Sequence, residues 1–250
     1  MPRPVAAMAR DLPSDYEIAW HSHPRFQLVY GAQGVMTVDT RGHNQGETWV
    51  VPPQRAVWLP PGIEHRIQTS SQVKFRTLYV AAEAAAAMPQ RCLAFAITPL
   101  LRELILRATE LPVEYDEHGA PGRVMQLILD ELASLISLPY NLPMPASKVL
   151  SGICRAIVES PNDRITIEEL GSRHGTTTRT LARRFRRETG MSFSEWRRRA
   201  RLLRALAWIA EGRPILAVAL DLGYDSPSAF SAMFKREFGL PPSQYRASAA

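Results

Sequence analysis

The sequence contains little cysteine and no long apolar run. Its two cysteines, Cys92 and Cys154, form no CxxC pair, which excludes a disulfide framework and a cysteine-rich zinc knuckle. We interpret both as small core residues. No stretch of about 18 apolar residues occurs, and the first residues, MPRPVAAMARDLPSD, lack the basic and apolar regions of an export signal. We therefore expect a cytoplasmic protein with no membrane partner.

Positive charge is concentrated in the last part of the chain. Residues 1–145 hold 12 Lys and Arg against 14 Asp and Glu, whereas residues 146–250 hold 18 against 10. With 250 residues, of which 46% are hydrophobic, the chain is long enough for two domains. A basic domain is typical of proteins that bind the phosphate backbone of a nucleic acid, although solvated basic faces are also common.

Local patterns predict an α+β multidomain protein, with strands first and helices after them. Between residues 16 and 80, short runs rich in β-branched and aromatic residues predict strands of a small barrel. These runs are FQLVY, VMTVD, TWVVP and KFRTLYV. From Pro99 onward, apolar residues recur at three- and four-residue spacing in LLRELILRATEL and RVMQLILDELASLISL. We interpret this second part as an amphipathic helical hairpin that forms a homodimer through its apolar stripes.

A proline-rich segment separates the two halves. PYNLPMPAS, at 139–147, has three prolines, a stiff composition that ends helices and suits a linker. The predicted domains are therefore a sensor and dimerisation domain at 1–138, a linker at 139–147, and an all-helical domain at 148–250.

The basic half contains an internal repeat. TTTRTLARRFRRETGMSFSEW, at 176–196, matches DSPSAFSAMFKREFGLPPSQY, at 225–245, with an offset of 49. Upstream, ITIEELGSRHG and PILAVALDLGY each predict a short helix that closes on a glycine before a Thr or Ser N-cap. The pattern predicts a helix, a tight turn and a second helix, twice over, which is a double helix-turn-helix.

Such units bind DNA by placing the second helix in the major groove, where base edges carry a unique code. In the first copy we expect a helix from Thr177 to Glu188, with Leu181 and Phe185 on its buried face. Arg179 and Arg183, one turn apart, are our leading base readers, since arginine pairs with guanine or with a phosphate. The arginines of the long helix that follows, SFSEWRRRARLLRALAWIAEGR, suit phosphate contacts or a solvated face.

In these features the sequence resembles the AraC/XylS transcriptional regulators with a cupin-type N-terminal domain. The resemblance covers nearly the whole chain and is strongest in residues 150–247. The residues that carry it are Leu170, Leu181, Arg183, Phe185, Gly190, Ser192, Arg201, Ala205, Gly223, Tyr224, Ser226, Ser228, Phe230, Phe234, Gly239, Pro242 and Arg246. It implies sequence-specific control of transcription at double-stranded promoter DNA.

The second copy departs from the family pattern. Where the family often has polar or basic residues, this chain has Pro227, Ser231 and Ala232, so we expect poorer direct readout there and phosphate contacts from Lys235 or Arg236. The full set of predicted DNA-binding residues is Thr177, Arg179, Thr180, Arg183, Arg186, Ser226, Ser228, Lys235 and Arg236.

Two short motifs near the N-terminus bring three histidines into one candidate site. HSHPRFQLVYGAQG, at 21–34, has the form HxHxxxQx6G, and PPGIEH ends in His65; both resemble cupin motifs, with Gln27 where many cupins have glutamate. If His21 and His23 lie on one strand they share a face, and with His65 and Gln27 they predict one divalent transition metal ion, Zn, Ni, Fe or Cu. Alternatively, these histidines line a pocket for an organic ligand.

The sequence therefore predicts a transcriptional regulator that responds to a small molecule or a metal ion through its N-terminal domain. The alternative is a cupin-type metal-dependent enzyme, an oxygenase or isomerase. An enzyme leaves the two helix-turn-helix units without a role, so we favour the regulator and expect no catalytic residues.

Overall fold

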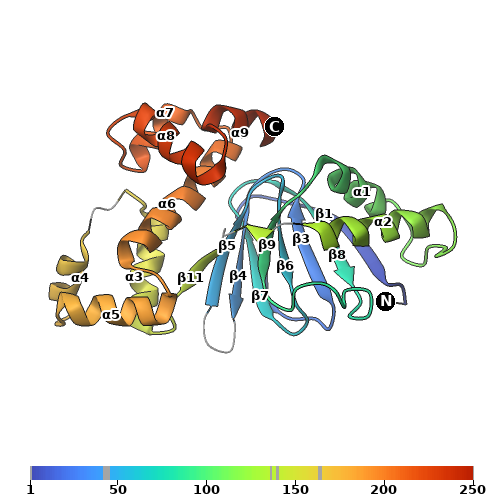
Figure 1. The fold of residues 1–250 in the computed structure, drawn as a ribbon, viewed down its shortest axis with the longest axis horizontal. Helices are drawn as coiled ribbons and strands as arrows, with labels where there is room; N and C mark the ends of the chain where they lie inside the picture. Colours follow the sequence, from blue (N-terminus) through green and yellow to red (C-terminus); the bar gives the residue numbers. More distant parts are fainter. Residues whose placement is uncertain (1, 42–45, 136, 139–140, 163–164, 250) are drawn as a thin grey trace. The chain divides into compact units, whose positions relative to one another are not determined.

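The computed structural model describes residues 2–41, 46–135, 137–138, 141–162 and 165–249 (Figure 1). The chain divides into two compact units, one formed mainly by residues up to Asn141 and the other mainly by residues from Leu142 onward. We call them the β unit and the helical unit. The division falls within the segment predicted to be a linker.

The strands form two sheets, and all strand pairings recorded in them are antiparallel. In spatial order, the six-stranded sheet contains β1 (Val5–Leu12), β8 (Val73–Val80), β3 (Phe26–Gly31), β6 (Arg55–Leu59), β9 (Leu93–Ala96) and β10 (Ser137–Leu138). The five-stranded sheet contains β11 (Asn141–Met144), β5 (Gly46–Val51), β4 (Met36–Arg41), β7 (Glu64–Thr69) and β2 (Glu17–His21). The predicted fold class, a cupin-like β domain followed by an all-helical domain, is confirmed.

Two helices, α1 (Pro99–Thr109) and α2 (Ala120–Ser134), cover one face of the six-stranded sheet (Figure 1). Alternate residues of β3, Phe26, Leu28 and Tyr30, share a hydrophobic core with these helices. Gln27 lies between them in the sequence, so its side chain points to the opposite face of β3, where it is also buried. The sheet thereby separates the helix-covered apolar core from a second buried face, on which Gln27 lies beside the apolar Val29.

The expectation that the hairpin's apolar stripes are free for dimerisation is wrong. Leu104 and Leu135 of these stripes are partly buried against the core shared with the sheet, and the other stripe residues are fully buried in it: Leu101, Ile105, Met125, Ile128 and Leu132. Burying this area against the sheet already satisfies the amphipathic pattern of both helices. The second helix also ends earlier than expected, at Ser134, and Ser137–Leu138 pairs with β9 as a strand.

The helical unit contains α3 to α9. Their bounds are α3 (Lys148–Glu159), α4 (Ile167–Arg173), α5 (Thr178–Thr189), α6 (Phe193–Ala210), α7 (Ile215–Asp221), α8 (Pro227–Phe238) and α9 (Pro242–Ala249). Pairs α4–α5 and α7–α8 are the two predicted helix-turn-helix units, joined by the 18-residue α6. Within the described ranges, none of the helices has the length and apolar character needed to cross a membrane.

The repeat is visible in how α5 and α8 begin and end. Thr177 and Ser226 are their N-caps, each side chain accepting a backbone N–H from the third residue of the helix. Gly190 and Gly239 end them in the left-handed conformation, with φ of 74° and 79°. In the helix and turn before each of these two helices, equivalent residues are 48 apart instead of 49. Thr176 N donates to Gly171 O in the first copy, and Tyr224 N donates to Ala219 O in the second. The second turn therefore has one extra residue before its N-cap.

The predicted linker is held to neighbouring structure along part of its length. Asn141–Met144 forms the edge strand β11, and Pro143 O accepts a hydrogen bond of 2.7 Å from Nε1 of the buried Trp196. Ser147 N donates to the Glu188 carboxylate at 3.0 Å. Residues 139 and 140 lie outside the described residues. The backbone at Pro143 is extended as predicted, but it is paired as part of β11.

Replacing Gly171 with alanine should destabilise the helical unit by about 1 to 3 kcal/mol, the usual cost of overpacking. An added Cβ would lie 2.9 Å from Thr176 O and 3.3 Å from Thr178 N, both backbone atoms of the tight turn that leads into α5. Gly152→Ala is the matched control, because a Cβ there has nothing within 4 Å and should stabilise α3 slightly. Denaturant unfolding measures both; equal stabilities would contradict the close packing at this turn.

Candidate functional sites

Two adjacent strands of the five-stranded sheet bring the histidines of the two motifs together. His21, at the end of β2, lies directly opposite His65 of β7. His23 does not share that strand, contrary to prediction, because β2 ends at His21. Its segment is held beside the second motif by a 2.9 Å hydrogen bond from Gly62 N to His23 O. The three rings therefore converge, with centroids 4.2, 5.1 and 6.1 Å apart.

Each of the three histidines is oriented by a backbone carbonyl. Nδ1 of His21, His23 and His65 lies 2.8, 2.7 and 2.9 Å from the carbonyl oxygens of Ala19, Arg25 and Ile63 respectively. Because a carbonyl oxygen only accepts, each Nδ1 carries a proton, so in the neutral imidazole Nε2 is the nitrogen with an electron pair for a metal. Such anchoring is typical of metal-binding histidines. One ligand atom from each of the three residues lies within 4.8 Å of the others.

His65 is the most buried member of the set. Burial lowers its pKa to about 4, so this imidazole is neutral at neutral pH, the state in which histidine binds a metal. Among the described residues, its Nε2 is a buried polar atom without a hydrogen-bond partner. A buried nitrogen of this kind costs free energy unless a donor or a cation satisfies it. The donor set and this atom fit a divalent transition metal ion.

Gln27 lies next to the histidines in an orientation set by its neighbours. Its Nε2 donates to Thr77 Oγ1 at 2.9 Å and to Tyr79 OH at 3.3 Å, while Thr77 Oγ1 donates to Leu28 O. Gln27 Oε1 therefore points to Nε2 of His23, 2.8 Å away. An amide oxygen only accepts, so His23 Nε2 donates to it when no ion is bound, and an ion at Nε2 would replace that proton. Sequence reasoning found Gln27 but missed Thr77 and Tyr79, which share its face from β8.

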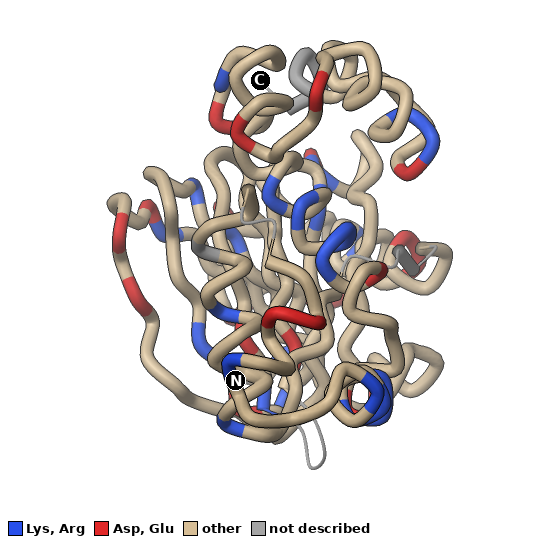
Figure 2. The backbone as a smooth tube through the Cα atoms, turned by 90° about the vertical axis from the view of Figure 1, so that its left-hand side faces the viewer, with Lys and Arg blue, Asp and Glu red and all other residues tan. Residues whose placement is uncertain are grey.

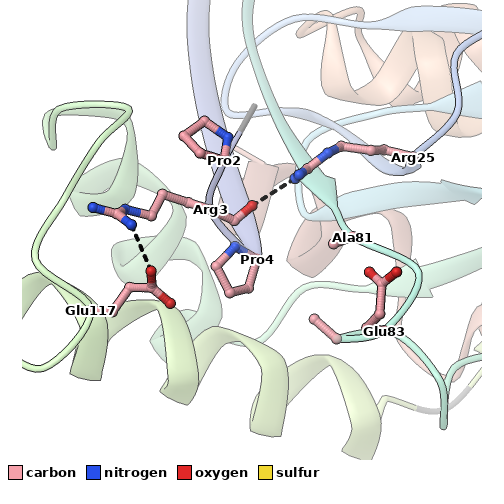
Figure 3. Close-up of a pocket in the computed structure, with 8 residues that line it drawn as sticks. Pro2, Arg3, Pro4, Arg25, Ala81, Glu83 and Glu117 are labelled. Atoms are coloured by element: carbon pink, nitrogen blue, oxygen red, sulfur yellow. Dashed lines mark hydrogen bonds and ion pairs between the residues drawn. The ribbon is translucent and has the colours of Figure 1, made fainter.

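Arg25 connects this site to the N-terminal segment. Its carbonyl orients His23, and its guanidinium donates to Arg3 O at 2.8 Å. Arg3 in turn pairs with Glu117 at 2.7 Å, in the segment that leads into α2 (Figure 3). Arg25, Arg3, Glu83 and Glu117 line a surface pocket together with Pro2 and Pro4. Its two arginines and two carboxylates leave the pocket without a net charge.

In the helical unit, α5 presents basic residues on its outer face. Leu181 and Phe185 are buried as predicted, whereas Arg179, Thr180, Arg183 and Arg186 are exposed. Within the described part of the chain, neither Arg179 nor Arg183 has an ion-pair partner. Both guanidinium groups therefore remain available to a ligand that approaches this face.

The second copy, α8, presents a different surface. Ser228, Lys235 and Arg236 are exposed, while Ser226 is half-buried because its side chain caps the helix. Arg236 lies 3.6 Å from Glu237, an exposed pair that is screened by solvent. All nine predicted DNA-binding residues lie on the second helix of a helix-turn-helix unit or at its N-cap.

Basic residues are concentrated on α5 and the first half of α6 (Figure 2). Several arginines of α6, for which phosphate contacts or a solvated face were expected, make contacts within the helical unit. Arg197 Nη1 donates to Ile165 O at 2.7 Å and Arg201 Nε to Pro161 O at 2.8 Å. Arg204 is half-buried over the ring of Trp208. Of this run, only Arg198 is exposed, and it lies 3.7 Å from Glu237.

Comparison with known proteins matches the chain to two domain families. The AraC-like ligand binding domain matches residues 9–170, and a helix-turn-helix domain matches residues 170–248. The HTH-type transcriptional regulator NimR of Escherichia coli K12 is 31% identical over 225 residues, which are 90% of this chain and 81% of NimR. The chain belongs to the AraC family of transcriptional regulators. The regulatory protein SoxS of Salmonella typhimurium is 34% identical over 104 residues, 41% of this chain and 97% of SoxS.

Among solved structures, apo ToxT from Vibrio cholerae aligns with 99% of this chain and 98% of its own, at 12% identity and a TM-score of 0.41. As an AraC-family member, the chain is a DNA-binding transcriptional regulator with a ligand-binding domain, and it is not an enzyme. The helical unit is the DNA-binding part, and the β unit is the part that takes a small effector.

Proposed function

We propose that the β unit binds one divalent transition metal ion through Nε2 of His21, His23 and His65, and that this site senses the signal for the DNA-binding unit. The observation that carries the proposal is the convergence of one ring nitrogen from each of three histidines whose rings are all fixed by backbone carbonyls. Gln27 Oε1 is suited to be a fourth donor. When bound, the ion would supply open coordination positions for an effector with a donor atom of its own.

The donor set limits which ion suits the site. Three neutral imidazoles favour Zn, Ni, Fe or Cu, and the amide of Gln27 adds no negative charge. The site is thus less anionic than an iron site that includes a carboxylate. If the ion is not bound, the same polar groups form one wall of a pocket for an organic effector, which is the second candidate for this site.

For the helical unit, we propose that Arg179 and Arg183 read guanine bases in the major groove, and that Arg186, Lys235 and Arg236 contact phosphates. The exposure of these groups and their place on the second helix of each unit support this assignment. A regulator of this kind works on chromosomal DNA, so we also propose a cytoplasmic location.

The experiment that tests the whole function is genomic binding-site mapping with the native protein, in cells with and without added metal. We expect a small set of promoters whose occupancy changes with the metal. Occupancy that is specific but never responds to metal would leave the DNA assignment intact and contradict the metal sensor. Binding without any sequence preference would contradict the assignment of the base readers.

We further propose that the protein is a homodimer formed by the outer faces of α1 and α2. With the main stripes buried, Leu100 and Leu127 remain, 49% and 42% exposed. The double variant Leu100→Lys, Leu127→Lys should raise the dimer dissociation constant at least about tenfold, because each lysine would be desolvated at the interface. Analytical ultracentrifugation of the full chain measures this; Met8→Lys, at a 41% exposed residue of β1, is the control. A monomeric wild type would remove the dimer proposal.

A further inference from the structure

The two reading helices carry unlike side chains at matched positions. Their N-caps and left-handed glycines align α5 with α8 at an offset of 49. At the positions of Arg179 and Arg183, α8 has Ser228 and Ala232. The counterpart of Thr180 is Ala229. The second helix therefore has the same frame as the first but no long side chain in its first two turns on the outer face.

The small residues of α8 face outward. Ser228, Ala229 and Ala232 are exposed, whereas Phe230, Met233 and Phe234 are buried in the helical unit. Ala229 and Ala232 are three residues apart, so their methyl groups lie on the same side of the helix. The basic residues Lys235 and Arg236 come about one turn later. The first part of α8 thus presents an apolar surface of two methyl groups, followed by positive charge.

In the major groove, the C5-methyl group of thymine is the apolar feature of the base edges. Alanine contacts this methyl group, whereas arginine pairs with guanine. Small side chains also let the helix backbone approach the bases closely, since no long side chain separates them. Lys235 and Arg236 are placed to hold the phosphates once the helix lies in the groove.

We propose that α8 reads thymine methyl groups through Ala229 and Ala232, so that the binding site combines a guanine-containing subsite under α5 with a thymine-containing subsite under α8. This inference rests on the proposed function of α5 and α8 as reading helices. The 18-residue α6, about 27 Å long, joins the two units and suits neighbouring turns of the major groove. The resulting DNA site is asymmetric in base composition, because the two reading helices contact different bases.

The test begins with selection of sites from a randomised DNA library by the full-length protein. Each thymine of the selected site is then replaced with deoxyuridine, which removes only the methyl group. We expect affinity to fall about fourfold for each thymine that contacts α8, the value of one buried methyl-sized group. Guanines at the α5 subsite should instead respond to substitution by 7-deazaguanine, which removes an acceptor from the base edge.

A variant assigns the thymine subsite to α8. Ala232→Arg copies the residue at the matched position of α5, and its exposure leaves the fold unchanged. We expect it to change the preferred base from thymine to guanine at one position of the deoxyuridine-sensitive subsite. Ala232→Ser is the control. It keeps the side chain small and should leave the base preference at the guanine-containing subsite under α5 unchanged.

Two results would overturn the inference while leaving the reading helices in place. One is a site with clear guanine preference at which no deoxyuridine substitution lowers affinity. The other is a base change caused by Ala232→Arg outside the deoxyuridine-sensitive subsite. If selection yields no preferred sequence at all, the proposed function fails first, so the two failures are distinguishable.

Discussion

Wild-type protein supplied with zinc should hold close to one ion per chain, and His65→Ala should hold none under the same conditions. His65 supplies one of three converging ring nitrogens, and its Nε2 has no hydrogen-bond partner among the described residues. Loss of a group that only orients a metal ligand already weakens metal binding about 10- to 100-fold, so loss of a ligand should weaken it by about 100-fold or more. Elemental analysis of untagged protein measures the ion content.

Controls separate loss of the ligand from loss of the fold. His118→Ala removes an exposed histidine of the same unit and should keep the ion. His21→Ala removes a half-buried ligand, which leaves a smaller cavity than His65→Ala, and should also lose it. Both variants should bind promoter DNA in gel shifts, because the helical unit is unchanged. A wild type that stays metal-free with zinc, nickel, iron and copper would leave the histidines as the wall of an organic-ligand pocket.

Arg183→Ala should lower specific DNA affinity by about 1 to 3 kcal/mol and relax the sequence preference at one base pair. Arg183 is exposed on the first half of α5, with no ion-pair partner in the described ranges, and lies one turn from Arg179. Arg91→Ala removes the same charge from the β unit and should have little effect. Footprinting on a library of sites is the measurement. Equal weakening on every sequence, with a shallower salt dependence, would instead make Arg183 a phosphate contact.

The helical unit was largely predictable because its signals are local. The N-caps Thr177 and Ser226, the glycines after each helix and the spacing of Leu181 and Phe185 all act within a few residues of chain. The change of offset from 49 to 48 was not predictable in the same way. It depends on how tightly each turn closes, which is a property of the folded backbone.

The β unit was harder to predict because strand pairing is not local. β1, with the sequence VAAMARDL, has alanine where strong strand formers are expected, and its pairing with β8 joins residues far apart in the chain. For the same reason the apolar stripes of α1 and α2 revealed that the helices are amphipathic but not what covers them. The six-stranded sheet covers these stripes, so the apolar area left on α1 and α2 for a dimer interface is much smaller than the sequence predicted.

At the candidate metal centre, the spacing of the motifs predicted which histidines meet. It did not predict how they are held, because the carbonyls of Ala19, Arg25 and Ile63 are presented by the local course of the backbone. The bonds of Gln27 to Thr77 and Tyr79 depend on the register between β3 and β8, which no single segment contains.

The unpartnered Nε2 of His65 has a thermodynamic consequence for the whole chain. An ion that binds only the folded β unit stabilises that unit by RT ln(1 + [ion]/Kd), about 2.7 kcal/mol when its free concentration is 100 times Kd. The helical unit contributes none of the three histidines. In a calorimetric scan, each candidate ion should therefore raise the melting temperature of the transition that unfolds the β unit, which ranks the ions by affinity before any effector or promoter is known.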